Sequence, residues 1–164
     1  MPSQLTITRY FTHSQQEVYD AFTTSESLQN WWGSAGYEME VKTFEFHPEG
    51  IFHFVLRDKE NNDIWAKWVF KEILESSKLQ FINCFSNEAG ETVKAPEVPF
   101  GSDWPMEMIV DLEFYKEDGR TRIDLVSFPH GASDASKQVF ADNVGKMERA
   151  FGETFDQLEK YLSK

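Results

Sequence analysis

Few residues of this sequence have the type and spacing that chemistry at a site requires. The four histidines, His13, His47, His53 and His130, lie far apart and show no metal-ligand spacing. The single cysteine, Cys84, stands in an apolar stretch where nothing activates its thiol. The sequence contains no glycine-rich phosphate loop. We therefore predict no catalytic residue, no metal site and no bound cofactor.

Polar residues on apolar strand faces are better candidates. Glu72 and Asn83 each continue an alternating row of large apolar side chains. Because a buried polar group needs a hydrogen-bond partner, a ligand or water in a cavity could supply one. A β-bulge would instead turn Glu72 to solvent, and the sequence leaves both orientations open. An enzyme on this scaffold could draw only on Glu72, Asn83, Asp111 or His130, so acid–base catalysis is kept as an alternative.

Composition limits the class of protein. The chain has 164 residues with a net charge of −12, and it carries 15 Phe, 5 Trp and 5 Tyr. This charge disfavours nucleic acids and anionic membranes as partners, and the apolar content indicates an ordered chain. The length suits one domain over residues 1–164. No signal peptide or long apolar run is present, so we expect a cytoplasmic location.

The apolar pattern predicts the elements that must position these side chains. Alternation predicts a first strand at residues 5–12, and a capping box at Ser14 predicts a short helix, with a second at residues 25–30. The turns between the later strands are short, which requires antiparallel pairing. These six strands are predicted at residues 38–46, 51–57, 64–74, 79–85, 106–115 and 120–128.

One long amphipathic helix is predicted to follow Ser133 and to run to the end of the chain. Gly145 and Gly152 lie off its apolar side, where they either mark a bend or close packing, or are simply tolerated. A twisted sheet must curl around this helix to bury its apolar face. One helix does not fill the concavity, so the remaining space holds large side chains or a cavity.

The order of several motifs carries a resemblance to a known family. They lie at residues 18–22, 31–32, 48–54, 70–73, 121–125 and 155–162. The chain resembles the START-like, helix-grip superfamily and, within it, the family of homologues of the activator of heat-shock-protein-90 ATPase. The resemblance implies an α+β fold in which a seven-stranded curved antiparallel sheet wraps a long C-terminal helix, with two short helices after the first strand. It also implies an interior ligand cavity.

The sequence departs from the family pattern at two positions. Glu49 precedes Gly50 where the family often has two glycines, and Trp68 stands where a glycine is common. A tryptophan at this position is expected to shrink or reshape the cavity. The segment at residues 87–105 is longer than usual, and Phe100 and Trp104 are predicted either to cover the cavity as a lid or to belong to a surface hairpin.

Strand parity selects the residues expected to line the cavity. They are mostly aromatic and thioether side chains, which suit an apolar or aromatic ligand, although any one of them is more often a core residue. One tryptophan of the pair Trp31 and Trp32 is expected to cover the cavity mouth, and the other to pack behind the sheet. The predicted ligand-binding residues are Trp32, Phe52, Phe54, Trp68, Phe70, Phe81, Asn83, Phe85, Trp104, Met106, Met108, Met147 and Phe151.

The leading hypothesis is non-catalytic binding of a small hydrophobic molecule. A cyclase- or hydrolase-type enzyme is one alternative, and a chaperone-associated regulatory module, suggested by the family resemblance, is another. Trp65 and Trp104 are predicted to be exposed, which leaves both a monomer and a homodimer open.

Overall fold

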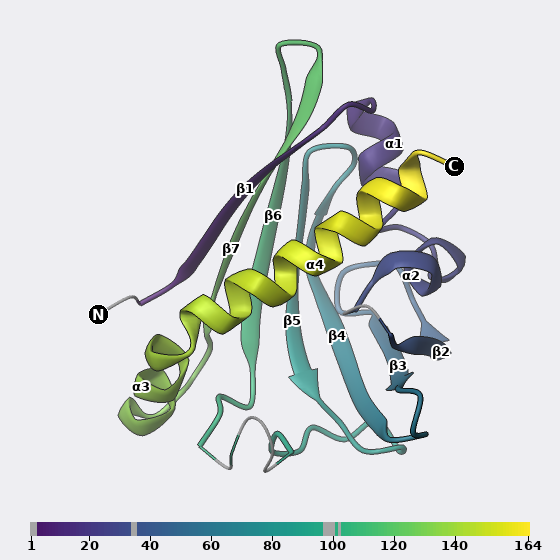
Figure 1. The fold of residues 1–164 in the computed structure, drawn as a ribbon. Helices are drawn as coiled ribbons and strands as arrows, with labels where there is room; N and C mark the ends of the chain where they lie inside the picture. Colours follow the sequence, from purple (N-terminus) through teal and green to yellow (C-terminus); the bar gives the residue numbers. More distant parts are fainter. Residues whose placement is uncertain (1–2, 34–35, 97–100, 102) are drawn as a thin grey trace.

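A single antiparallel sheet forms the body of the computed structural model, which describes residues 3–33, 36–96, 101 and 103–164. The order of its seven strands is β1-β7-β6-β5-β4-β3-β2, so the first strand joins the last and the other strands form a meander (Figure 1). The strands are β1 (Leu5–Phe11), β2 (Glu38–Phe44), β3 (Ile51–Arg57), β4 (Asp63–Leu74), β5 (Lys78–Phe85), β6 (Met108–Glu117) and β7 (Arg120–Pro129).

Two short helices follow β1, as the sequence predicts. α1 (Gln15–Asp20) begins after Ser14, whose hydroxyl oxygen accepts a hydrogen bond from the backbone N–H of Glu17. α2 (Ser25–Trp31) is capped in the same way by Thr24. Both caps satisfy helix N–H groups that have no partner within the helix.

The predicted single C-terminal helix is wrong in one respect, because it is divided at Asn143. α3 (Asp134–Asp142) precedes this residue and α4 (Val144–Leu162) follows it. Asn143 leaves helical geometry at φ −115° and ψ 10°, and its side-chain amide donates to the carbonyl oxygen of Val139 at 2.7 Å. An Asn side chain competes with the helix for backbone groups, which explains a break here rather than at Gly145 or Gly152.

α4 lies diagonally across one face of the sheet (Figure 1). Its 19 residues span about 28 Å, and Phe155 and Leu158 are fully buried beneath it. Arg9 on β1 ties the helix to the sheet, because its guanidinium lies 2.5 Å from the Asp156 carboxylate. The fold is the predicted helix-grip arrangement of a curved sheet and a long helix.

Alternation along the strands places the predicted apolar faces toward α4. The buried side chains on this concave face include those of Phe52, Trp68, Phe81, Val110 and Leu125. The prediction is wrong at Met106, because β6 begins only at Met108 and Met106 lies before it in a loop, with 42% of its surface exposed. The sheet alternation that places Met108 inside therefore does not extend to Met106.

A β-bulge decides the orientation of Glu72. The register between β4 and β5 shifts between Phe70 and Glu72, so Phe70 faces the core while Glu72 pairs with Gln80. The Glu72 carboxylate is exposed and lies 2.6 Å from the Lys78 ammonium. Of the two orientations that the sequence leaves open, the structure has the outward one.

The turn before β3 is tight. Glu49 adopts a φ of 69°, in the left-handed region that favours glycine. Gly50 has no room for a side chain, since an added Cβ would lie 2.8 Å from the His47 carbonyl oxygen and nearer still to that of Glu45. The missing family glycine at residue 49 is thus replaced by a glutamate in a strained conformation.

The start of the long loop after β5 packs on the other, convex face of the sheet. His53 Nε2 lies 3.1 Å from the carbonyl oxygen of Asn87, and the Lys67 ammonium donates to that of Gly90 at 2.9 Å. On the same convex face Val55 is fully buried, and His53, which the loop contacts, is 6% exposed. The loop therefore gives β3, β4 and β5 a second buried layer.

Candidate ligand cavity

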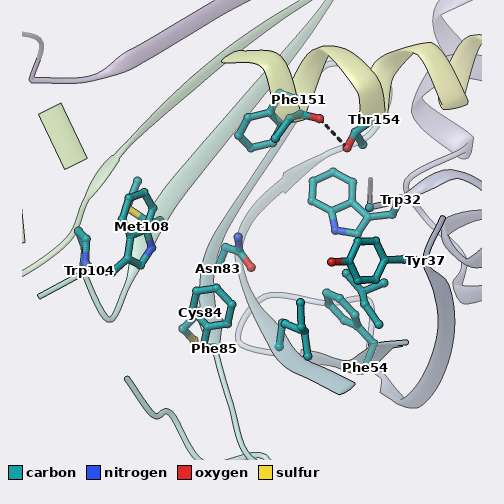
Figure 2. A pocket seen from close by; sticks show the side chains of 16 residues that line it. Trp32, Tyr37, Phe54, Asn83, Cys84, Phe85, Trp104, Met108, Phe151 and Thr154 are labelled. Carbon is teal, nitrogen blue, oxygen red and sulfur yellow. Dashed lines mark hydrogen bonds between the residues drawn. The ribbon is translucent and has the colours of Figure 1, made fainter. Parts of the chain in front are cut away.

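A cavity of about 290 Å³ lies under α4 at the end of the sheet where β3, β4, β5 and β6 meet the loop before β6. It is partly open to solvent, and side chains from the sheet, the helix and the turn after α2 surround it in Figure 2. The predicted site residues that line it are Trp32, Phe54, Asn83, Phe85, Trp104, Met108 and Phe151.

The other predicted site residues lie elsewhere. Met106 is exposed and Met147 is half-buried on α4, and neither belongs to the cavity wall. Four aromatic residues are fully buried core residues that pack beside the cavity without lining it. They are Phe52, Trp68, Phe70 and Phe81.

Trp68 closes the inner end of the concave face. Its ring stacks on that of Phe81, with centroids 3.8 Å apart, and meets the ring of Trp32 edge to face at 4.8 Å. Its indole nitrogen is buried without a hydrogen-bond partner among the described residues. The ring of Trp68 thus occupies core space beside Trp32, which lines the cavity, and the effect of this residue on the cavity size stays a prediction.

Trp32 is the first residue after α2, and its backbone is fixed by α4. The side-chain amide of Gln157 donates to the carbonyl oxygen of Trp31 at 3.2 Å and also to that of Gly33. Trp31 itself points away from the cavity, packs on Phe22 and donates its indole N–H to the Ala21 carbonyl oxygen at 2.9 Å. Trp32 thus lines the cavity, while Trp31 packs among the short helices on the side of α4 and not behind the sheet, the position expected for one of the pair.

Three polar side chains turn toward the cavity. Figure 2 shows the amide of Asn83, the indole nitrogen of Trp32 and the hydroxyl of Tyr37 directed at the same space. Asn83 is placed there by its register on β5, opposite Trp68 on β4 and Met108 on β6. A fourth group, the hydroxyl of Thr154, is already bonded to the carbonyl oxygen of Ala150 at 3.1 Å.

Sequence reasoning missed Tyr37 and the small lining residues. Tyr37 lies in the connection between α2 and β2, where no periodicity indicates the direction of a side chain. Gly33 lies in the same connection, and Thr154 lies on the apolar side of α4 but is polar. The alternation of β3 and β4 could have found several of the others. The missed lining residues are Gly33, Tyr37, Leu56, Ile64, Ala66, Cys84, Pro105, Ala150 and Thr154.

The titratable residues considered for catalysis are not brought together at the cavity. Neither Glu72 nor Asp111 lines it; both carboxylates lie near the Lys78 ammonium, at 2.6 and 3.7 Å. Burial raises the pKa of the Asp111 carboxyl, against the opposing effect of Lys78. His130 follows β7 in an exposed position and does not line the cavity either.

Cys84 borders the cavity, but its thiol is directed elsewhere. The sulfur lies 3.8 Å from both the Lys67 carbonyl oxygen and the Thr92 hydroxyl oxygen, beneath the loop on the convex face. Burial raises the pKa of the thiol, so the thiolate is disfavoured at neutral pH. Within the ranges that the structure describes, no group of three or more His, Cys, Asp or Glu residues could hold a metal ion.

Trp104 lines the cavity from the loop before β6. Only 7% of its surface is exposed, so the predicted exposed position is wrong, and one of the two tryptophans that suggested dimerisation is buried. Trp65 is half-buried on the convex face beside His53. Phe100, the other residue of the predicted lid, lies outside the described residues.

A family model places the chain among known proteins. The model described as Activator of Hsp90 ATPase homolog 1-like protein matches residues 12–163. The chain belongs to this family. The match covers almost every element named above, from the end of β1 to the end of α4. No curated protein sequence matches the chain.

Solved structures of similar proteins share the fold. A protein from Arthrobacter aurescens is 22% identical with a TM-score of 0.80, over 98% of this chain and 86% of the other. A protein from Chromobacterium violaceum is 14% identical with a TM-score of 0.77, over 100% and 99% of the two chains. The AHSA1 protein from Silicibacter pomeroyi is 13% identical with a TM-score of 0.73, over 98% and 97%. At these identities the likeness concerns the fold alone.

Within the described part of the chain, no helix is long and apolar enough to cross a membrane.

Proposed function

We propose that this member of the family binds a small hydrophobic or aromatic molecule, without chemical conversion, in the cavity between the sheet and α4. The observation that carries the proposal is a preformed cavity whose wall consists mainly of aromatic and aliphatic side chains. Such walls with a few polar groups are typical of small-molecule sites.

The walls favour a rigid, flat ligand. Trp32 and Phe151 approach each other edge to face at 6.2 Å, and Phe54 and Phe85 line the same cavity from β3 and β5. Aromatic rings prefer such offset or edge contacts with other rings. An aromatic ligand would therefore gain ring contacts in addition to the transfer of its apolar surface out of water.

A catalytic role is less well supported. Among the described residues that line the cavity, none has a carboxyl, imidazole, amine or guanidinium group. General acid–base catalysis would then depend on the Tyr37 hydroxyl or the Cys84 thiol, and the thiol points to the opposite side of the sheet. Binding without conversion requires neither group to change its protonation state.

Titration with N-phenyl-1-naphthylamine, an uncharged fluorescent probe, tests the proposal. We expect saturable binding with an enhanced emission. In an Ala66→Phe variant the new ring would fill the cavity from β4, where Ala66 is buried in its wall, and we expect at least a tenfold loss of affinity. Ala89→Phe makes the same chemical change at an exposed loop position and is the matched control. Absence of binding, or equal binding by both variants, would remove the cavity as the site.

A chaperone-associated role is a second candidate, and the observation that favours it is the family itself. In this role the protein would alter the ATPase activity of a heat-shock protein. Addition of this protein to a purified chaperone of the 90-kDa class, with ATP turnover as the readout, tests the role directly. An unchanged turnover over a range of protein concentrations would exclude it.

A further inference from the structure

We infer that the ligand is an uncharged two-ring aromatic compound that carries one hydrogen-bond-accepting oxygen, and that Asn83 recognises this oxygen. The inference rests on the proposed function and narrows it to a chemical class. It depends on three features of the cavity, namely its size, its unpartnered polar groups and its lack of charge.

The size of the cavity sets the size of the ligand. An apolar protein cavity of about 150 Å³ holds one benzene ring. The cavity here has a volume of about 290 Å³, close to twice that value. Two fused rings, as in a naphthalene or an indole, would therefore fill it, whereas one ring would leave contacts unmade. Trp68 and Phe81, stacked at 3.8 Å, exclude an extension of the ligand toward the inner end of the sheet.

The polar groups set the position and kind of the polar atom in the ligand. Among the described residues, no side chain makes a hydrogen bond to the Asn83 amide, the Trp32 indole N–H or the Tyr37 hydroxyl, although all three line the cavity. Trp32 can only donate, Asn83 can donate and accept, and Tyr37 can do both. A group that satisfies Trp32 and Asn83 together must accept hydrogen bonds. A hydroxyl or carbonyl oxygen has this property.

The absence of charge selects a neutral compound. None of the described lining residues is acidic, basic or a histidine, so an ionised ligand would lose water without gaining an opposite charge. An anion would meet a further cost, because the protein carries a net charge of −12. A cation would find aromatic rings in the wall, but no carboxylate among the described lining residues would replace the water that it loses.

The backbone holds Asn83 at this position. Its strand, β5, is central in the sheet and pairs with β4 and β6 on either side. A side chain on a central strand cannot leave the concave face without a change of register, which would also expose Phe81. The polar group of the site is thus preorganised, and its recognition of an oxygen costs little ordering of the protein.

Four matched two-ring probes test the inference by displacement of N-phenyl-1-naphthylamine. They are naphthalene, 2-naphthol, 2-naphthoate and 2-naphthylmethylammonium. We expect 2-naphthol to bind most tightly, about five- to tenfold better than naphthalene, because one net hydrogen bond contributes about that factor. The two charged probes should each bind at least tenfold more weakly than 2-naphthol.

The variant Asn83→Leu keeps the size of the side chain and removes its amide. We expect it to abolish the advantage of 2-naphthol over naphthalene while naphthalene binds as well as before. Gln80→Leu is the matched control on the same strand, because the Gln80 amide bonds to Asp111 at 3.2 Å outside the cavity. Trp32→Phe keeps a ring and removes the other donor, and it should reduce the same advantage.

The outcomes separate this inference from the proposed function. Equal affinities for naphthalene and 2-naphthol, tight binding of a charged probe, or an unchanged preference in Asn83→Leu would overturn the inference and leave cavity binding intact. Failure of all four probes, together with failure of N-phenyl-1-naphthylamine itself, would overturn both.

Discussion

The indole ring of Trp68 lies flat against the phenyl ring of Phe81, with their centroids 3.8 Å apart and their planes 11° apart. Both side chains are fully buried, and they come from adjacent strands, β4 and β5. This stack occupies the part of the concave face next to the cavity. The size of the cavity is therefore decided by a residue that does not line it.

Replacement of Trp68 by Ala should enlarge the cavity and destabilise the fold. Loss of a buried tryptophan costs about 3–5 kcal/mol in the free energy of unfolding. Because Trp68 lies 4.8 Å from Trp32, the new space would join the cavity, and we expect three-ring anthracene to gain affinity relative to naphthalene. The control is Trp65→Ala, on the same strand but half-buried on the convex face. It should lower the free energy of unfolding clearly less and leave the affinities for anthracene and naphthalene unchanged. Denaturant unfolding and probe displacement measure the two effects, and an unaltered anthracene preference would contradict the prediction.

Replacement of Gln157 by Leu should weaken ligand binding more than it weakens the fold. Its amide holds the carbonyl oxygens on both sides of Trp32, so its loss frees the turn that carries this lining residue. We expect a cost of about 1–2 kcal/mol in the free energy of unfolding and a several-fold loss of probe affinity. Glu153→Ala, at an exposed position on the same helix, is the control. Equal affinity in the two variants would show that Trp32 does not depend on Gln157.

Because of Tyr19, the free energy of unfolding should depend on pH in the alkaline range. Its hydroxyl is buried without a hydrogen-bond partner among the described residues, and burial, assisted by Glu75 and Asp20, raises its pKa from 10.0 to about 12. Between these values the unfolded chain has lost this proton and the folded chain has kept it. The free energy of unfolding should therefore fall with rising pH, by about 1.4 kcal/mol per unit from this group.

The variant Tyr19→Phe should lack this contribution. We expect it to be at least as stable as the wild type at neutral pH, because the hydroxyl is desolvated without compensation. The difference in the free energy of unfolding between the variant and the wild type should grow as the pH rises through 10. Denaturant unfolding from pH 8 to 11 measures this difference. A constant difference between the two proteins over this range would disprove the assignment of the slope to Tyr19.

Neighbouring substitutions in the turn before β3 should have opposite effects. Glu49→Gly relieves a left-handed conformation at φ 69°, at the loss of an exposed ion pair with Lys71, and should stabilise the fold by about 0.5–1 kcal/mol. Gly50→Ala places a Cβ against the Glu45 and His47 carbonyl oxygens and should destabilise it by about 3 kcal/mol or more. Thermal unfolding of the two variants tests both signs, and a shift in the same direction would refute the account of the turn.

The sequence by itself determined the architecture and most of the inner face of the sheet. Period-two alternation assigns Phe52, Phe81 and Met108 to one side, since a strand has only two faces. It also predicted two short helices and the cap of the first at Ser14, because a capping side chain acts on its own neighbouring backbone groups. These features depend on interactions that are local in the chain.

Only the tertiary structure decided which of these inward residues meet empty space. Phe54 lines the cavity while Phe52, two residues earlier on the same face, is core, because the position of α4 and the ring of Trp68 fill one end of the concavity and not the other. Tyr37 reaches the cavity from a connection that has no periodic pattern. Glu72 leaves the inner face at a β-bulge whose position the alternation of the strand does not predict. The helix is likewise divided at Asn143, although the apolar pattern of the sequence continues through this position. Packing between distant segments sets these features, and a local pattern does not contain that information.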